Sequence, residues 1–331
     1  MSLEVSAEWR FSLKIVVLDG YTLNPGDLSW DGIRQLGELV VYDRTPSEKT
    51  IERIGDADII LTNKVLLTKE ILMQTPSVKY IGVIATGYNV VDIEIAKELG
   101  IIVTNVPAYS TASVAQLVFA FILELCHHVG EHSREVHNGA WTKSIDFSFW
   151  NYPLVELAGK TLGIIGFGAI GQATAKIAAA FGMNILFFNR TRKPELETDI
   201  IRFAELDDVL SKSDFISLHC PLTNETKALI NKHTIAKMKD GAFLINTSRG
   251  DVLVEQDVAE ALNSGKLAGV GVDVVSIEPI KEDNPLLKAK NCIITPHFAW
   301  AAKESRVRLM DTLIKNIQAF LDNNSINVVN M

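Results

Sequence analysis

Short runs rich in valine, isoleucine and leucine alternate with helix-period segments in the first third of the chain. Continuous apolar runs of this length are typical of strands buried on both faces. The runs are KIVVLD (14–19), LVVY (39–42), ADIILT (57–62), VKYIGVIA (78–85) and IIVT (101–104). The clearest helix between them, VVDIEIAKELG (90–100), ends on a glycine suited to a helix C-terminus. The pattern predicts a doubly wound parallel sheet covered by helices on both faces.

A second alternating series occupies residues 161–295. Its runs are TLGIIG (161–166), NILFFN (184–189), DFISLH (214–219), GAFLIN (241–246), LAGVGVD (267–273) and CIIT (292–295). Apolar spacing predicts a long helix over 113–128, ahead of this series, and another near 303–322, after it. We interpret His127 and His128 as cations at the end of the first helix rather than as ligands. The pattern predicts a second α/β domain, residues 107–296, inserted into a first domain made of residues 1–106 and 297–331.

Composition and charge narrow the functional classes. The formal net charge of −8 argues against a nucleic-acid partner, because phosphate backbones need a basic face. The longest apolar run, LVFAFIL (117–123), is too short to span a bilayer, so no membrane partner is expected. The N-terminus lacks the layout of a secretory signal, and its first dozen residues are interpreted as an extension. Three cysteines without metal-ligand spacing predict a reduced, cytoplasmic setting and no metal site.

A glycine-rich turn directly follows the first strand of the second series. In GIIGFGAIGQATAKIAAAFG (163–182), Gly166, Gly168 and Gly171 have G-x-G-x-x-G spacing and open an alanine-rich helix. The first glycine permits a tight turn, the second admits a pyrophosphate, and the third lets helix and strand pack closely. The N–H groups at the helix N-terminus then face the anion. The turn predicts dinucleotide binding, and an unoccupied turn in a structural α/β domain is the alternative.

Three longer motifs carry a family resemblance. They are INTSRGDVL (245–253), GVDVVSIEP (271–279) and the pair NPLL with NCIITPHFAWA (284–301). With them the chain, from Lys14 to its final helix, resembles the D-isomer-specific 2-hydroxyacid dehydrogenases. The narrower similarity is to the glycerate dehydrogenase (hydroxypyruvate reductase) branch, and it rests on residues 18–32, 147–168 and 296–301.

The resemblance implies a fold and a reaction. The fold is α/β, with a Rossmann coenzyme domain (107–296) inserted into a flavodoxin-like substrate domain (1–106 and 297–331), and the active site lies in the cleft. The reaction is reversible reduction of hydroxypyruvate to D-glycerate, with glyoxylate as a slower substrate. A homodimer is also implied, formed in part by the segment that contains Trp141 and Trp150. Burial of these two tryptophans within the monomer is the alternative.

Three residues suit the chemistry of a 2-oxo acid. Arg249 follows a predicted strand, and its planar guanidinium matches a carboxylate. His297 can give a proton to the carbonyl oxygen in reduction and take it back in oxidation. Glu278 lies nineteen positions before His297 and could hold its other ring nitrogen, which favours the protonated imidazole. The family resemblance assigns the same roles. The alternatives are a surface cation, a solvated loop acid and a residue at a helix N-terminus.

The resemblance also supplies binding residues. For the substrate they are Thr86 and Gly87, whose backbone N–H groups would face the carboxylate, together with Arg249, His297 and Trp300. A plain strand-to-helix turn and core packing of the tryptophan are the alternatives. For the coenzyme they are Gly166, Gly168, Ala169, Ile170, Gly171, Asn189, Arg190, Cys220, Thr226, Thr247, Ser248 and Asp273.

The stretch LFFNRTRK (186–193) bears on the choice of coenzyme. It lies where such folds usually offer a carboxylate, which binds the ribose hydroxyls and repels a 2′-phosphate. Asn189 removes that repulsion, and Arg190, with Arg192 and Lys193 nearby, can pair with a phosphate. The sequence therefore favours NADP(H), whereas the resemblance alone favours NAD. A solvated basic loop beside bound NAD is the alternative.

Two other functions stay open. One is a dehydrogenase for another 2-oxo acid, such as pyruvate, because motifs separate these branches poorly. The other is a dinucleotide-sensing corepressor, since such members of the superfamily can keep the same Arg, Glu and His. The chain lacks the long polar, Pro-rich tail suited to recruiting partners, which argues against the corepressor.

Overall fold

The structure is a computed structural model, and it describes residues 13–331. The predicted N-terminal extension lies outside the described residues. The chain forms two compact units. Unit 1 contains the chain up to Ser110 together with Ala301–Met331, and unit 2 is Thr111–Trp300. The chain crosses between them at 110/111 and 300/301, whereas the predicted boundaries were 106/107 and 296/297. Which unit binds coenzyme and which binds substrate stays a prediction.

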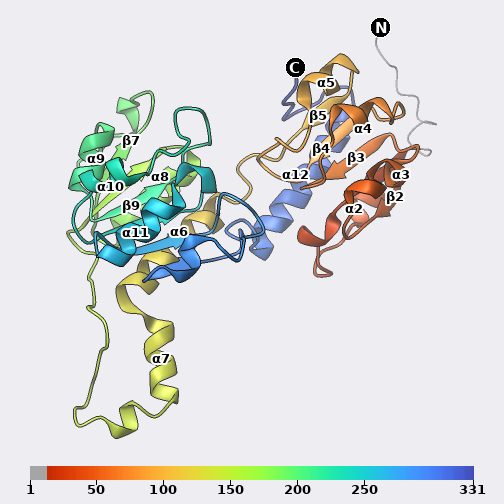
Figure 1. Ribbon diagram of the computed structural model, residues 1–331. Coiled ribbons are helices and arrows are strands. Elements are labelled where there is room, and N and C mark those ends of the chain that lie inside the picture. The colour runs from red at the N-terminus through yellow and green to blue at the C-terminus, as the bar shows by residue number, and fades with distance from the viewer. Residues whose placement is uncertain (1–12) are drawn as a thin grey trace. The chain divides into compact units, whose positions relative to one another are not determined.

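Unit 1 is built on a parallel sheet in the order β2-β1-β3-β4-β5 (Figure 1). This order is that of flavodoxin-like folds. The strands are β1 (Lys14–Val17), β2 (Glu38–Val41), β3 (Ile59–Thr62), β4 (Tyr80–Val83) and β5 (Ile102–Thr104). β3 and β4 are buried along their whole length, as their continuous apolar sequences require.

Within residues 13–331, the helices of unit 1 are short except for the last. They are α2 (Asp31–Arg34), α3 (Thr50–Ile54), α4 (Lys69–Met73), α5 (Ile93–Glu98) and α12 (Lys303–Leu321). Asp92 caps the start of α5 by accepting the N–H of Ile95 at 3.2 Å, and Gly100 follows its end with a φ of +71°. The predicted glycine stop of this helix is therefore present. α12 buries Leu309, Leu313 and Ile317 within the unit.

Unit 2 contains a parallel sheet in the order β12-β11-β10-β9-β6-β7-β8. Six of these strands, β8-β7-β6-β9-β10-β11, have the doubly wound order of dinucleotide-binding folds. The seventh strand, β12, extends the sheet beside β11. The strands are β6 (Thr161–Ile165), β7 (Asn184–Phe188), β8 (Ile201–Phe203), β9 (Phe215–Leu218), β10 (Ala242–Asn246), β11 (Leu267–Val272) and β12 (Cys292–Ile294). The two sheets together confirm the predicted pair of parallel α/β folds.

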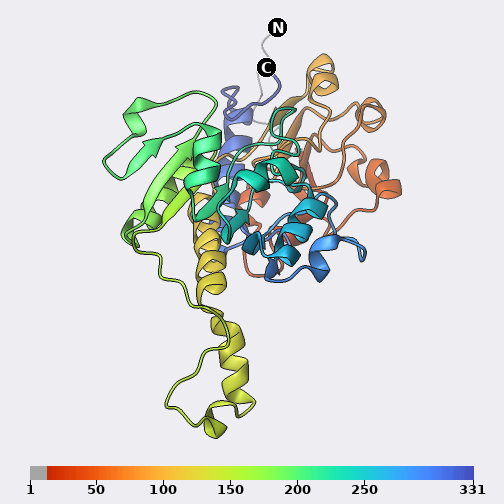
Figure 2. The same ribbon diagram turned by 60° about the vertical axis from the view of Figure 1, so that its left-hand side comes forward.

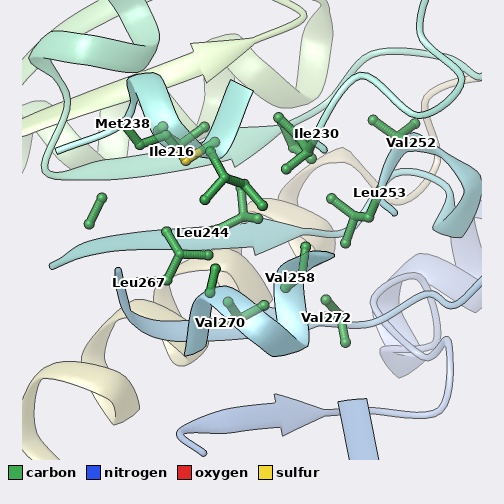
Figure 3. Packing of buried hydrophobic residues seen from close by; sticks show 14 of the residues in the cluster. Ile216, Ile230, Met238, Leu244, Val252, Leu253, Val258, Leu267, Val270 and Val272 are labelled. Carbon is green, nitrogen blue, oxygen red and sulfur yellow. The ribbon is translucent and has the colours of Figure 1, made fainter. Parts of the chain in front are cut away.

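Both faces of the unit 2 sheet are packed. Along β10, Leu244 belongs to one buried cluster, whereas Phe243 and Ile245 belong to the other. Figure 3 shows the first cluster, in which Leu244 and Val270 from the strands lie near Val258 from a helix. The helices are α6 (Thr111–His127), α7 (Val129–His137), α8 (Ala169–Ala180), α9 (Leu206–Lys212), α10 (Lys232–Lys237) and α11 (Glu255–Ser264).

Two features of unit 2 differ from the sequence prediction. The predicted helix over 113–128 ends at His127, because His128 takes a left-handed backbone with a φ of +49°. The chain then bends by 53° and continues as α7. Figures 1 and 2 both show α7 and the segment after it extending away from the sheet of unit 2. The second difference is β8, an edge strand of three residues that the sequence pattern did not predict.

Candidate active site

The glycine turn joins β6 to α8 with the geometry that its sequence predicts. Gly166 has a φ of +95°, and a Cβ there would lie 2.6 Å from the backbone nitrogen of Cys220. A Cβ on Gly171 would lie 2.4 Å from the carbonyl oxygen of Gly166. A Cβ on Gly168, by contrast, would meet nothing within 4 Å. The turn is therefore closed on its protein side and open at the exposed N-terminus of α8, where Ala169 and Ile170 begin the helix.

Asn189 lies at the end of β7, and its side chain is part of the glycine turn. Its Oδ1 accepts a hydrogen bond from the N–H of Phe167 at 3.1 Å. The amide Nδ2, a donor, is what remains for a ligand. Arg190 beside it is exposed. Arg192 is engaged elsewhere, because its Nε donates to Glu197 at 2.8 Å. Of these two arginines, only Arg190 therefore remains available to bind a phosphate, as the sequence predicted for both.

Arg249 projects from a turn at the end of β10. Asn246 shapes this turn, since its Nδ2 donates to the carbonyl oxygen of Arg249 at 2.9 Å. The Oδ1 of Asn246 accepts from both the N–H and the hydroxyl of Ser248, at 3.0 and 2.7 Å. The guanidinium is exposed, and its Nη1 donates to the carbonyl oxygen of Ser248 at 2.7 Å. Within residues 13–331 this is its one hydrogen bond, so the other donors of the fork can meet a ligand.

Glu278 and His297 form a pair in unit 2. The Nδ1 of His297 and the Oε2 of Glu278 are 2.6 Å apart, and both side chains are about one-third exposed, at 30% and 33%. His297 has a left-handed backbone, with a φ of +52°. Its N–H donates to the carbonyl oxygen of Asp273 at 2.8 Å. Because the carboxylate holds Nδ1, Nε2 is the ring nitrogen that can exchange a proton with a ligand.

Asp273 fixes the loop on which His297 lies. Its Oδ1 accepts from the hydroxyl of Thr295 at 2.6 Å and from the N–H of Phe298 at 3.0 Å. Its Oδ2 accepts from the N–H of Ala299 at 2.8 Å. Burial raises the pKa of Asp273 above its ordinary value, and these hydrogen bonds act in the opposite direction. The predicted coenzyme residue is thus a support of the histidine loop, and a coenzyme contact stays a prediction.

The other predicted residues are placed as follows. The hydroxyl of Thr226 donates to the carbonyl oxygen of Pro221 at 2.6 Å, so it closes its own loop. The indole N–H of Trp300 donates to the carbonyl oxygen of His297 at 3.0 Å. In unit 1, Thr86 and Gly87 follow β4, and the hydroxyl of Thr86 donates to the carbonyl oxygen of Val106 at 2.9 Å.

The residues of unit 2 fit a dinucleotide. The open side of the glycine turn offers unpaired N–H groups at a helix N-terminus, as a pyrophosphate requires. At the end of β10, the buried hydroxyl of Thr247 has no hydrogen-bond partner within the described residues. Such an orphaned polar group next to Arg249 is typical of a position where a ligand supplies the partner. Cys220 packs against the glycine turn, and burial raises the pKa of its thiol, so it stays neutral.

Two further features, a metal site and a membrane-spanning helix, are absent from residues 13–331. No group of three or more His, Cys, Asp or Glu residues could hold a metal ion. No single helix is long and apolar enough to cross a membrane, although α6 and α7 together meet that test across their 53° bend. α6 buries Val118, Phe121 and Leu125 in the core of unit 2.

The sequence model of one protein family matches residues 119–299, more than half of the chain. Its description is "D-isomer specific 2-hydroxyacid dehydrogenase, NAD binding domain". The chain belongs to this family. Members of the family are NAD(P)-dependent oxidoreductases, so the chain is an enzyme that uses a nicotinamide coenzyme and a small hydroxy or oxo acid.

Individual members of the family resemble the chain over nearly its whole length. A hydroxypyruvate reductase from Blautia hydrogenotrophica is 58% identical over 321 residues, which are 96% of this chain and 100% of that protein. A glycerate dehydrogenase from Methylorubrum extorquens is 40% identical over 319 residues, 96% and 98% of the two chains. A crystal structure of D-lactate dehydrogenase from Aquifex aeolicus, complexed with NAD and lactic acid, is 31% identical. Its TM-score is 0.83 over 96% of this chain and 100% of that one. These similarities confirm the narrower resemblance to the glycerate dehydrogenase branch.

Sequence reasoning missed two supporting residues of this family member. Asn246 lies within the motif INTSRGDVL, and its role was not predicted, although an Asn at a strand end often forms a turn through its own side chain. Glu255, the first residue of α11, accepts three hydrogen bonds from the loop that contains Glu278. No local sequence signal connects residues that lie twenty-one and twenty-nine positions apart.

Proposed function

We propose that the enzyme reduces hydroxypyruvate to D-glycerate, reversibly, and that glyoxylate is a slower substrate. The observation that carries the proposal is the hydrogen bond of 2.6 Å between Glu278 and His297, on the unit that also bears the exposed Arg249. The 58% identical hydroxypyruvate reductase supports the choice of substrate. Glyoxylate lacks the hydroxymethyl group of hydroxypyruvate, so it gains less binding energy and reacts more slowly.

The chemistry follows from the groups present. A nicotinamide coenzyme, when bound, supplies the hydride that reaches C2 of the 2-oxo acid. As C2 becomes tetrahedral, negative charge develops on its carbonyl oxygen, and His297 gives that oxygen a proton from Nε2. Glu278 stabilises the protonated imidazole through Nδ1 before the transfer. Arg249 binds the carboxylate of the substrate through paired N–H donors. In oxidation the same proton returns to His297.

The substrate contacts proposed on unit 1 are the backbone N–H groups of Thr86 and Gly87. Both residues lie in the segment that follows β4, beyond the carboxyl end of a parallel strand, where α/β sheets bind ligands. The hydroxyl of Thr86 is held by Val106, which orients this loop. Trp300, held against the backbone of His297, is proposed to limit the size of the substrate side chain.

For the coenzyme we propose a preference for NADPH over NADH. Asn189 places no negative charge near the adenine ribose, and its Oδ1 is already occupied by Phe167. The remaining amide N–H can donate to a 2′-phosphate, and the exposed Arg190 adds a charge-assisted hydrogen bond. An acidic residue in this position would instead repel the phosphate.

One assay tests substrate and coenzyme together. The wild-type enzyme and an Arg190→Ala variant are given hydroxypyruvate, glyoxylate, pyruvate and a bulky 2-oxo acid, each with NADH and with NADPH. The highest kcat/KM is expected for hydroxypyruvate, followed by glyoxylate. Faster turnover of pyruvate or of the bulky acid would refute the proposed substrate. Tight coenzyme binding without any turnover would refute the proposed reaction.

The same assay decides the coenzyme. Wild-type kcat/KM is expected to be higher with NADPH, and Arg190→Ala is expected to lower it roughly tenfold while NADH is little affected, because a charged hydrogen bond is lost. Arg202→Ala, which removes an exposed arginine from neighbouring β8, is the matched control and should change neither coenzyme. A wild-type preference for NADH would show that the basic cluster is only surface charge.

We also propose that the enzyme is a homodimer joined through the arm, residues 129–156. The arm exposes large apolar side chains that a monomer does not cover: Trp141 at 53%, Ile145 at 102%, Phe147 at 91%, Trp150 at 65% and Leu154 at 52%. Large exposed apolar side chains gathered in one short segment are typical of an interface. Trp141 and Trp150 are thus not buried within the monomer, which was the alternative interpretation.

Sedimentation equilibrium at micromolar concentration tests the dimer. The wild type is expected at twice the chain mass of 36.5 kDa. Phe147→Asp is expected to shift the enzyme to monomers, since a charge would have to be desolvated in the interface. Met73→Asp, which changes a 62% exposed residue of α4, should leave the dimer intact. A monomeric wild type would refute the proposal.

A further inference from the structure

We infer that Glu255 is a positioning residue for the reaction, because its carboxylate fixes the loop that carries Glu278. Glu255 is the first residue of α11 and follows the turn of Arg249 by six positions. It is half-buried and lies outside the set of residues that would touch substrate or coenzyme. The inference rests on the proposed function, in which Glu278 stabilises the protonated form of His297.

The carboxylate of Glu255 binds both ends of one loop. Its Oε1 accepts from the N–H of Ser276 at 2.7 Å. Its Oε2 accepts from the hydroxyl of Ser276 at 2.9 Å and from Nδ2 of Asn284 at 3.0 Å. Asn284 is itself fixed, because its Oδ1 accepts from the N–H of Leu286 at the start of the 3₁₀ turn Pro285–Lys288. Glu278 lies between these two attachment points, so the loop that carries it is held at both ends by a single carboxylate.

The turn of Arg249 packs directly against the same loop. A Cβ on Gly250 would lie 1.9 Å from the carbonyl carbon of Val275 and 2.3 Å from the nitrogen of Ser276, so only glycine permits this approach. The N–H of Val275 donates in turn to Oε1 of Glu278 at 3.3 Å. The two consecutive peptides on either side of Val275 therefore contact the Arg249 turn, Glu255 and Glu278. A displacement of this short backbone segment would move the carboxylate-binding and the proton-transferring groups relative to each other.

Charged hydrogen bonds make this support sensitive to substitution. Glu278 reaches His297 through one short contact, and a hydrogen bond weakens steeply when its distance or angle changes. A displacement of about 1 Å in a catalytic group can reduce the rate on the order of 100-fold. Loss of the Glu255 carboxylate leaves the N–H of Ser276 and the amide of Asn284 without their acceptor, so the loop can shift. The expected defect lies in the chemical step and not in coenzyme binding.

The test compares Glu255→Ala, Glu255→Gln and Glu260→Ala with wild type. Glu260 lies on the same helix, is exposed and accepts a hydrogen bond from Gln256 at 2.8 Å, so it is the matched control. With hydroxypyruvate, Glu255→Ala is expected to lower kcat at least tenfold and to leave the KM for coenzyme within twofold. Glu255→Gln keeps an acceptor oxygen and should recover part of kcat. Glu260→Ala should behave as wild type.

A double-variant cycle separates positioning from a general structural role. Because Glu255 acts through Glu278, the Glu255→Ala substitution should lower kcat only slightly further in a Glu278→Gln background. Equal losses of kcat in both backgrounds, or an unchanged kcat in Glu255→Ala, would overturn the inference.

A readout without substrate distinguishes this inference from the proposed function. Amide hydrogen exchange in residues 275–284 should be faster in Glu255→Ala than in wild type or Glu260→Ala, while α11 itself keeps its protection. Unchanged exchange would overturn the positioning role even in an active enzyme. If Glu255→Ala shows faster exchange but the wild type reduces no 2-oxo acid, the anchoring of the loop by Glu255 is supported and only the proposed reaction is refuted.

Discussion

His297→Ala is expected to reduce kcat for hydroxypyruvate by about 10²–10⁴-fold, because the substitution removes the imidazole that delivers the proton. The Nδ1 of the imidazole is held by Glu278 at 2.6 Å, which leaves Nε2 to serve the carbonyl oxygen. Glu278→Gln should give a smaller loss than His297→Ala, since the ring remains but the charge that stabilises its protonated form is removed.

Steady-state kinetics at several pH values, together with coenzyme titration by fluorescence, measures the effect of His297→Ala. Coenzyme affinity should persist, because the glycine turn and the end of β7 lie in a different part of unit 2 from the histidine loop. His233→Ala is a suitable control: this histidine is exposed in the first turn of α10. A near-native kcat in His297→Ala would refute its role as the general acid.

Arg249→Lys is expected to lower kcat/KM for hydroxypyruvate by roughly 10–100-fold, mostly through KM. A lysine ammonium keeps the charge but cannot form the two parallel hydrogen bonds that a guanidinium makes with a carboxylate. Loss of one charged hydrogen bond corresponds to about this factor. The turn itself should survive, because Asn246 binds the backbone of residue 249 and not its side chain.

Initial rates over a range of hydroxypyruvate concentrations measure the effect of Arg249→Lys. The KM for coenzyme serves as the internal reference and should stay within a few fold of wild type. Arg202→Lys controls for the chemical change at an exposed site on β8. An unchanged kcat/KM in Arg249→Lys would show that the substrate carboxylate is bound elsewhere.

The strands of this fold could be predicted closely because most are buried on both faces. Their sequences are short, continuous apolar runs, so the prediction of a strand does not depend on distinguishing a helical from a strand-like spacing of apolar residues. β8 was missed because it pairs only with β7 at the edge of the sheet and exposes Arg202 in its middle. The break at His128 was missed because the residues on both sides are compatible with a helix, and one left-handed residue ends it.

The candidate site also contains residues that could be predicted from the sequence and residues that could not. Motifs name Arg249, Glu278 and His297, and the short contact between the last two could be anticipated from their chemistry. The supports of these residues could not be, because Asp273 and Glu255 accept hydrogen bonds from residues twenty-one to twenty-nine positions away. Such bonds depend on how loops fold back in space. The hydrogen bond of Arg192 to Glu197, five positions away, was also not predicted, because it depends on the conformation of the loop between them.

The last helix has a consequence for the order in which the chain can fold. α12 lies against β4, where the rings of Phe320 and Tyr80 are 4.8 Å apart, and Leu313 is fully buried. During synthesis the strands of unit 1 leave the ribosome before unit 2, but α12 follows only after the whole of unit 2. The sheet of unit 1 therefore stays uncovered on that side until α12 has been translated. Unit 2 is continuous in sequence, so it can complete its core before α12 is available to unit 1.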